Sequence, residues 1–91
     1  MSTEQQEKTQ YTVTVKTPGR SVHEVTTFVL EHARNDGRRL CAGLGNSGYV
    51  VVFAQRLKNL VCDGEPDEIF EYRDRDGVVT ELRSSKADLY R

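Results

Sequence analysis

The chain has 91 residues, a formal net charge of −1 and 36% hydrophobic residues, and its 30% of charged residues are nearly balanced in sign. A chain of this length forms one hydrophobic core, which excludes an enzyme with two lobes around a large catalytic cleft. No apolar run is long enough for a membrane span, and the first residues lack the basic and apolar parts of a secretory signal. We therefore expect a cytoplasmic protein with no membrane partner.

The first half of the sequence predicts a tail, a strand and a helix. Residues 1–9 are polar and predict a flexible tail before a single compact domain over 10–91. Tyr11–Lys16 alternates apolar and polar residues, as a half-buried strand does. Ser21 and Glu24 have the spacing of a capping box, so we expect an amphipathic helix over about Val22–Arg34, ended by Asn35-Asp36-Gly37.

The middle of the sequence predicts the most buried strand. Arg38–Ala42 and Tyr49–Ala54 flank a glycine-rich turn and are interpreted as a hairpin. Tyr49–Phe53 is apolar on both faces, which is typical of a central strand covered on two sides. Residues 55–61 have helical spacing of apolar residues but form a short stretch, so both helix and strand stay open.

The last third predicts a second hairpin. Cys62–Asp67 is a turn-rich linker, and Glu68–Arg73 and Val78–Arg83 surround an Asp-Gly pair that favours a tight turn. Ser84–Arg91 either docks or frays. The elements predict an α+β fold with one main amphipathic helix packed on an antiparallel sheet of four or five strands, in the order β-α-β-β-β-β. A helix at 55–61 would instead give a ferredoxin-like variant.

The sharpest motif is a glycine-rich segment in which Gly43, Gly45 and Gly48 fit the pattern G-x-G-x-x-G. A dinucleotide-binding turn must lead into a helix, but this segment leads into a strand, and the chain lacks the further segments of a protein kinase. What remains is a hairpin loop whose backbone N–H groups could contact a phosphate or simply turn the chain. A small-ligand sensor that uses this loop is the weakest functional hypothesis.

No pattern of catalytic or metal-binding residues emerges. His23 and His32 fall on opposite sides of the predicted helix, and Cys41 and Cys62 lack zinc-site spacing. We expect two buried thiols in a reducing compartment, with a strand-bridging disulfide as the alternative. The sequence therefore predicts no enzyme, no metal and no cofactor.

The leading functional hypothesis rests on the second apolar face of the central strand. One helix cannot cover Tyr49, Val51 and Phe53, and aromatic residues are usual anchors of protein interfaces. We expect a small non-catalytic protein-binding module, acting as a homodimer or as a stoichiometric regulator, adaptor or inhibitor of a larger protein, which uses this face and the edge of the hairpin over 68–83. The alternative is that the chain covers this face itself with Leu57, Leu60, Leu89 and Tyr90.

The alternative is a nucleic-acid-binding accessory protein. Its basic patch would lie beside the glycine-rich hairpin and consist of Arg38, Arg39, Arg56 and Lys58. The slightly acidic composition counts against this alternative, because phosphate neutralisation supplies most of the affinity of nucleic-acid binders.

Overall fold

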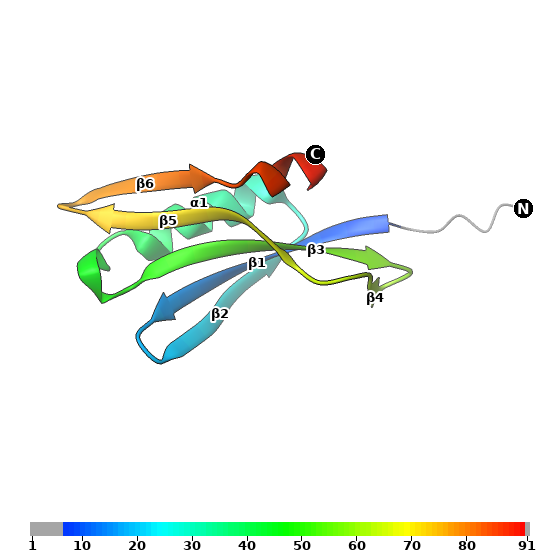
Figure 1. Ribbon diagram of the computed structural model, residues 1–91, viewed down its shortest axis with the longest axis horizontal. Coiled ribbons are helices and arrows are strands. Elements are labelled where there is room, and N and C mark those ends of the chain that lie inside the picture. The colour runs from blue at the N-terminus through cyan, green and yellow to red at the C-terminus, as the bar shows by residue number, and fades with distance from the viewer. Residues whose placement is uncertain (1–6, 91) are drawn as a thin grey trace, which may run out of the picture.

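The computed structural model describes residues 7–90, in which one α-helix packs against an antiparallel sheet (Figure 1). The elements in chain order are β1 (Glu7–Thr17), β2 (Arg20–Thr27), α1 (Leu30–Cys41), the short 3-10 helix η1 (Gly45–Ser47), β3 (Tyr49–Lys58), β4 (Val61–Cys62), β5 (Asp67–Arg75), β6 (Val78–Arg83) and the 3-10 helix η2 (Ser85–Tyr90). The strands lie in the order β2-β1-β3-β5-β6, and β4 pairs with the end of β3. The predicted α+β class is confirmed, with six strands rather than four or five. The first strand begins at Glu7, earlier than expected, and the rest of the predicted tail lies outside the described residues.

The helix prediction over Val22–Arg34 is wrong in its position. Residues 20–27 form β2, and the helix begins only at Leu30. Asn35-Asp36-Gly37, predicted to end the helix, lies inside it, and the strand predicted over Arg38–Ala42 is its last turn. The chain therefore begins β-β-α rather than β-α.

A β-bulge in β2 explains the error. Val25 pairs with Val13 of β1 and Val22 pairs with Val15, so the register shifts at Glu24. Because the bulge adds one residue, two valines three positions apart face the same side of the sheet. That spacing is also the spacing of a helix, and the sequence alone did not distinguish the two.

Gly37 lies where α1 approaches the sheet most closely. A Cβ atom at Gly37 would lie only 2.6 Å from Cε2 of Tyr72 on β5. The missing side chain therefore permits close packing of helix on strand, which is a different role from the helix stop that we expected.

Residues 55–61 are strand and turn, so the ferredoxin-like alternative with a second helix is wrong. Strand β3 continues to Lys58, and Asn59 and Leu60 turn the chain with φ of 52° and 67° into the short β4. The second predicted hairpin is confirmed, with Asp76 and Gly77 at positive φ between β5 and β6.

The core lies between α1 and the sheet. Strand β3 is central, as predicted: Val50 and Val52 are buried on the helix side, and Val51 is buried on the opposite side of the sheet. The core cluster on the helix side also contains Val13 of β1, Tyr72 of β5 and Ala33 of α1. The C-terminal η2 closes one end of this cluster with Tyr90, whose hydroxyl donates to Asp67. Burial and this hydrogen bond raise the pKa of Tyr90 to about 12.

A charged network fixes β6 beneath the helix. Arg34 of α1 donates two hydrogen bonds to the carboxylate of Glu81 on β6, at 2.7 and 3.1 Å, and the Tyr72 hydroxyl donates to the same carboxylate at 2.5 Å. Arg38 adds a third cationic contact at 3.0 Å. Such bidentate, charge-assisted bonds hold a fixed geometry, so the outermost strand is tied to the helix.

Candidate functional site

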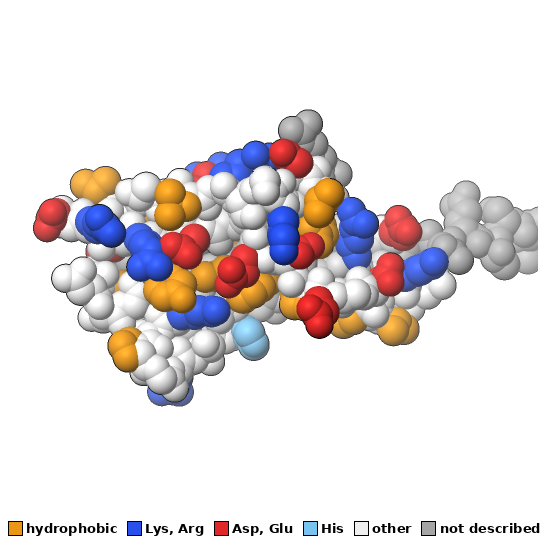
Figure 2. Space-filling model, viewed as in Figure 1, with side chains coloured by type: hydrophobic (Ala, Val, Ile, Leu, Met, Phe, Trp, Pro, Cys, Tyr) orange, Lys and Arg blue, Asp and Glu red, His pale blue; other side chains and the backbone are white. Residues whose placement is uncertain are grey.

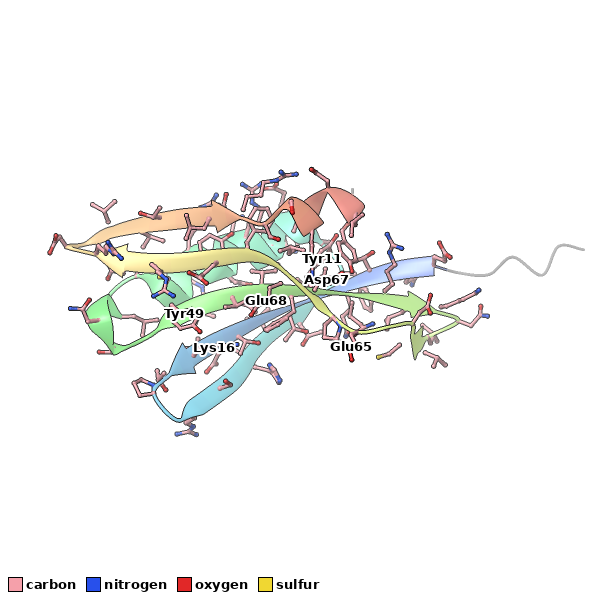
Figure 3. All side chains as sticks on the ribbon, in the orientation of Figure 1. Tyr11, Lys16, Tyr49, Glu65, Asp67 and Glu68 are labelled. Carbon is pink, nitrogen blue, oxygen red and sulfur yellow. The ribbon has the colours of Figure 1, made fainter. Side chains whose placement is uncertain are left out.

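The sheet face opposite α1 is covered by no other described element, and we call it the open face. Figure 2 shows it as a mixture of hydrophobic, basic and acidic side chains. Lys16, Tyr49 and Glu68 lie close together on it in Figure 3. The strand registers place these further side chains on the same face: Thr12, Thr14, His23, Val51, Phe53, Glu71, Arg73, Thr80 and Leu82.

Two aromatic rings on the open face are each covered by a cation. The guanidinium of Arg73 lies 4.3 Å from the centre of the Tyr49 ring, and the ammonium of Lys16 lies 5.4 Å from the centre of the Phe53 ring. Cations over aromatic rings are attracted by the ring quadrupole. The two aromatic residues are therefore only partly exposed, and each forms a composite surface with its cation.

Acidic residues hold both cations in place. Glu71 accepts a hydrogen bond from Nε of Arg73 at 2.6 Å, and Glu68 lies 3.6 Å from the ammonium of Lys16. These ion pairs are solvent-exposed, so each contributes little to stability. Their main effect is to order the long side chains of Lys16 and Arg73 on the open face.

Val51, a predicted interface residue, lies beneath these groups with 1% of its surface exposed. It lines a hollow of about 220 Å³ on the open face, to which the β5 segment around Phe70 also contributes, although the Phe70 ring packs on the helix side under Arg34. Leu82 of β6, which is 52% exposed, forms one wall. The rim is polar and consists of Glu68, Glu71, Arg83 and Ser84.

Two backbone N–H groups of the glycine-rich segment already donate hydrogen bonds to the side-chain carboxylate of Asp74. Oδ2 of Asp74 accepts hydrogen bonds from the backbone N–H groups of Gly43 at 2.8 Å and Gly45 at 3.3 Å. Gly48 instead packs against the backbone of Lys16, where a side chain would not fit. Two of the three predicted phosphate donors are thus already paired, and no sequence signal pointed to Asp74.

Both cysteines are free thiols. Cys41 is buried at the end of α1, while Cys62 in β4 is exposed, so the expectation of two buried thiols is wrong for Cys62. Burial, and secondarily the nearby charge of Asp74, raise the pKa of Cys41, which keeps this thiol protonated.

Within residues 7–90 no group of three or more potential ligands could hold a metal ion.

The four basic residues of the predicted nucleic-acid patch do not form one surface. Arg38 and Arg39 lie on α1 and pair with Glu81 and Asp36. The other two, Arg56 and Lys58, lie near the far end of β3, where Arg56 donates to the carbonyl of Leu89 at 2.7 Å. Arg38 lies over the ring of Tyr72, which pairs with Val50 of β3. Arg56 is six residues further along that strand, or roughly 20 Å at about 3.3 Å per residue.

A different set of cations surrounds a cleft at one end of the sheet. The cleft has a volume of about 670 Å³ and lies between the β1–β2 turn, the glycine-rich segment and the end of β5. Its lining includes Lys16, Arg20, Arg73 and Arg75. Arg20 and Arg75 make no ion pair with another described side chain. Sequence reasoning missed this cluster because it placed Arg20 next to a helix start and not in a hairpin turn.

Comparisons with protein families, with curated proteins and with solved structures find no match for this chain. None of the helices within residues 7–90 has the length and apolar character needed to cross a membrane. Function is therefore inferred from the geometry of the open face and the cleft.

Proposed function

We propose that this chain is a small non-catalytic protein-binding module of the cytoplasm, acting as a homodimer or as a stoichiometric regulator, adaptor or inhibitor of a larger protein. The observation that carries the proposal is the composition of the open face. Its partly exposed aromatic rings, ordered cations and apolar hollow are the features that anchor protein partners. The free thiols of Cys41 and Cys62 agree with a reducing compartment.

The hollow beside Leu82 is the place on the open face where a partner side chain would bind. The apolar side chains of Val51 and Leu82, surrounded by charged residues, resemble the arrangement of an interface hot spot, in which a polar rim excludes water from a central contact. A volume of about 220 Å³ accommodates one large apolar side chain. We therefore expect the partner to insert a single apolar residue there, with polar groups facing Glu68, Glu71 and Arg83.

The histidines support a non-catalytic role. His23 shares a hydrogen bond of 2.7 Å with Thr14 on the open face, while His32 is exposed on α1. They lie on different elements and on opposite sides of the sheet, so they cannot act together on one substrate.

The test compares partner binding by the wild type, two open-face variants and one control variant. Phe53→Ala removes an aromatic anchor, and Glu68→Arg reverses an exposed rim charge without touching the core. Each should weaken binding of a partner captured from the organism's own cells by at least about tenfold, since loss of a hot-spot residue costs about 2 kcal/mol. The affinity of the purified pair is measured by titration calorimetry.

Leu89→Ala is the matched control, because Leu89 is an exposed apolar residue in η2 and lies outside the open face. It should bind the partner as the wild type does. If all four forms bind the same proteins with the same affinity, the open face is not the binding surface and the proposal is wrong.

The cleft supports a second candidate, binding of a nucleic-acid backbone. Four cations from two separate hairpin regions line it, and two of them lack an ion-pair partner among the described side chains. On this hypothesis, a labelled single-stranded oligonucleotide binds with an affinity that falls steeply with salt. Replacing Arg20 and Arg75 by Ala should abolish that binding, while Arg39→Ala should leave it unchanged; binding that is absent or insensitive to salt removes this candidate.

A further inference from the structure

The two outer strands of the sheet differ in how they are protected. Strand β2 carries the bulge at Glu24 and displays Arg20 and His23, which are features that prevent edge-to-edge pairing. Strand β6 pairs with β5 in one uninterrupted register from Arg83 to Val78 and has no bulge, and the charges of its Glu81 and Arg83 are already compensated by Arg34, Arg38 and Asp88 of the same chain. An outer strand without such protection is a template for another strand.

Strand β6 also displays apolar surface in a symmetric pattern. Val78 is 64% exposed and Leu82 is 52% exposed, and both side chains lie on the open face. Thr80 lies midway between them on the same face and is exposed. A strand with two apolar side chains placed symmetrically about one residue is complementary to its own antiparallel copy.

The backbone of β6 is oriented to allow this pairing. The N–H of Ser84 donates to the carbonyl of Ile69 on β5 at 2.9 Å. Successive residues of a strand direct their backbone N–H and C=O groups to opposite sides. The backbone groups of Leu82 and Thr80, like those of Ser84, therefore point toward β5. The N–H and C=O groups of Val79 and Glu81 therefore point away from the sheet, where a further strand can bind them.

We propose that β6 pairs antiparallel with β6 of a second copy of this chain, about a twofold axis at Thr80. In this register Val78 lies opposite Leu82 of the second copy, and Val79 exchanges backbone hydrogen bonds with Glu81. The inference deepens the proposed function and rests on it, because it names one partner of the binding module as the chain itself.

The register brings the apolar side chains together closely. Thr80 with Thr80, and Val78 with Leu82, form non-hydrogen-bonded pairs, in which opposite Cα atoms are only about 4.5 Å apart. Both exposed apolar residues of β6 are then covered at once. Pairing of this kind satisfies the outer backbone groups and buries the apolar surface with the same set of residues.

The surroundings of β6 leave room for the second copy and match its charge. Helix α1 packs mainly over β1, β3 and β5 and meets β6 through the ion pairs of Arg34 and Arg38 with Glu81, on the face of the sheet opposite the open face. Glu81, which would lie opposite Val79, already has its charge compensated by Arg34 and Arg38. At the ends of the pairing, Arg83, which is paired with Asp88 of its own chain, would lie opposite Gly77 of the second copy.

The first experiment is disulfide trapping. In a Cys62→Ser background, which removes the exposed native thiol, Thr80→Cys places two thiols opposite each other at the twofold axis. A Cα separation of about 4.5 Å lies within the range of disulfides, so oxidation should convert most of the protein to a covalent dimer. Thr26→Cys is the matched control, an exposed threonine on the other outer strand, and should remain largely monomeric. Equal cross-linking of the two variants would reflect random collision and overturn the proposal.

The second experiment measures mass by light scattering over a range of concentrations. The wild type should reach twice the mass of the chain, and Thr80→Lys, which places like charges directly opposite, should raise the dimer dissociation constant by about tenfold or more. Phe53→Ala should remain a dimer, so loss of open-face binding and loss of dimerisation are separable. A monomeric wild type at every concentration, or a dimer unaffected by Thr80→Lys, contradicts the proposal.

Discussion

Gly37 illustrates how one absent side chain sets the distance between α1 and the sheet. In an exposed helix interior, replacing Gly by Ala stabilises a protein by about 1 kcal/mol. Here the new Cβ would lie 2.6 Å from the Tyr72 ring, which is fully buried and cannot swing away freely. Overpacking of this kind costs about 1–3 kcal/mol.

We therefore expect Gly37→Ala to lower the free energy of unfolding by about 1–2 kcal/mol, measured by urea denaturation. Asn35→Ala, at an exposed position of the same helix, should leave stability unchanged or raise it slightly. If Gly37→Ala proves more stable than the wild type, the Tyr72 ring has space that the packing described above does not contain.

The carboxylate of Glu81 makes a contribution to the stability of the folded state that depends on pH. Burial raises the pKa of Glu81, but the hydrogen bonds from Arg34 and Tyr72 outweigh this and hold the pKa below its ordinary value of 4.5. A depressed carboxylate pKa stabilises the folded state above the unfolded pKa. That contribution is lost as the pH falls through the lower pKa of the folded state.

Glu81→Gln should thus lower the free energy of unfolding by about 2 kcal/mol at neutral pH, because it weakens charge-assisted hydrogen bonds that are largely buried. The difference between variant and wild type should shrink steadily below about pH 4.5, as the wild-type carboxylate becomes protonated. Urea denaturation of both proteins between neutral and acidic pH measures this difference. A difference that stays constant over the whole range would mean that the charge of Glu81 does not contribute.

At the scale of elements, Asp74 of β5 organises the connection between α1 and β3. Its carboxylate accepts the N–H groups of Gly43 and Gly45, both of which adopt positive φ. Asp74→Ala should leave two donors without their acceptor and speed hydrogen exchange at these two amides, with a loss of about 1–3 kcal/mol of stability. Asp74→Asn keeps an acceptor oxygen and should retain much of the protection; equal exchange rates in all three proteins would show that the loop is held by other contacts.

The elements predicted well from sequence are those whose pattern is local. The alternation of Tyr11–Lys16, the doubly apolar Tyr49–Phe53 and the Asp-Gly turn at residue 76 each specify a strand or hairpin without tertiary context. The helix was misplaced because the bulge in β2 imitates a helical period and because Gly37 serves packing against Tyr72. Both effects depend on a neighbouring strand that the sequence does not reveal.

The candidate site was predicted only in part for the same reason. Tyr49, Val51 and Phe53 share the open face, as their alternation indicated. The cations that cover the two aromatic rings come from β1 and β5, which are distant in sequence and adjacent only in the folded sheet. The cationic cleft likewise depends on the β1–β2 turn reaching the end of β5.

At the scale of the whole molecule, the sheet has one face covered by α1 and one open face, and it ends in one protected and one unprotected strand. Pairing of β6 with a second copy would join two five-strand paths into one continuous sheet. The open faces of both copies would then lie side by side on the same surface, because a twofold axis perpendicular to a sheet preserves its faces. A partner could thus contact two sets of aromatic and cationic residues at once, which raises its apparent affinity without new contacts.

A dimer of this kind links folding to association, so its thermal midpoint must depend on protein concentration. A tenfold rise in protein concentration stabilises the folded dimer against unfolded chains by about 1.4 kcal/mol, which is ~0.7 kcal/mol per chain. For a domain of this size that corresponds to an increase in midpoint of roughly 3–5 °C. Calorimetry of the wild type at two concentrations should show this increase, whereas Thr80→Lys, whose outer strand carries an added charge that weakens the dimer, should melt at a lower midpoint and show a smaller increase over the same two concentrations. A wild-type midpoint that does not move means that the folded chain gains no stability from a second copy, because only association that favours the folded state raises the midpoint in this way.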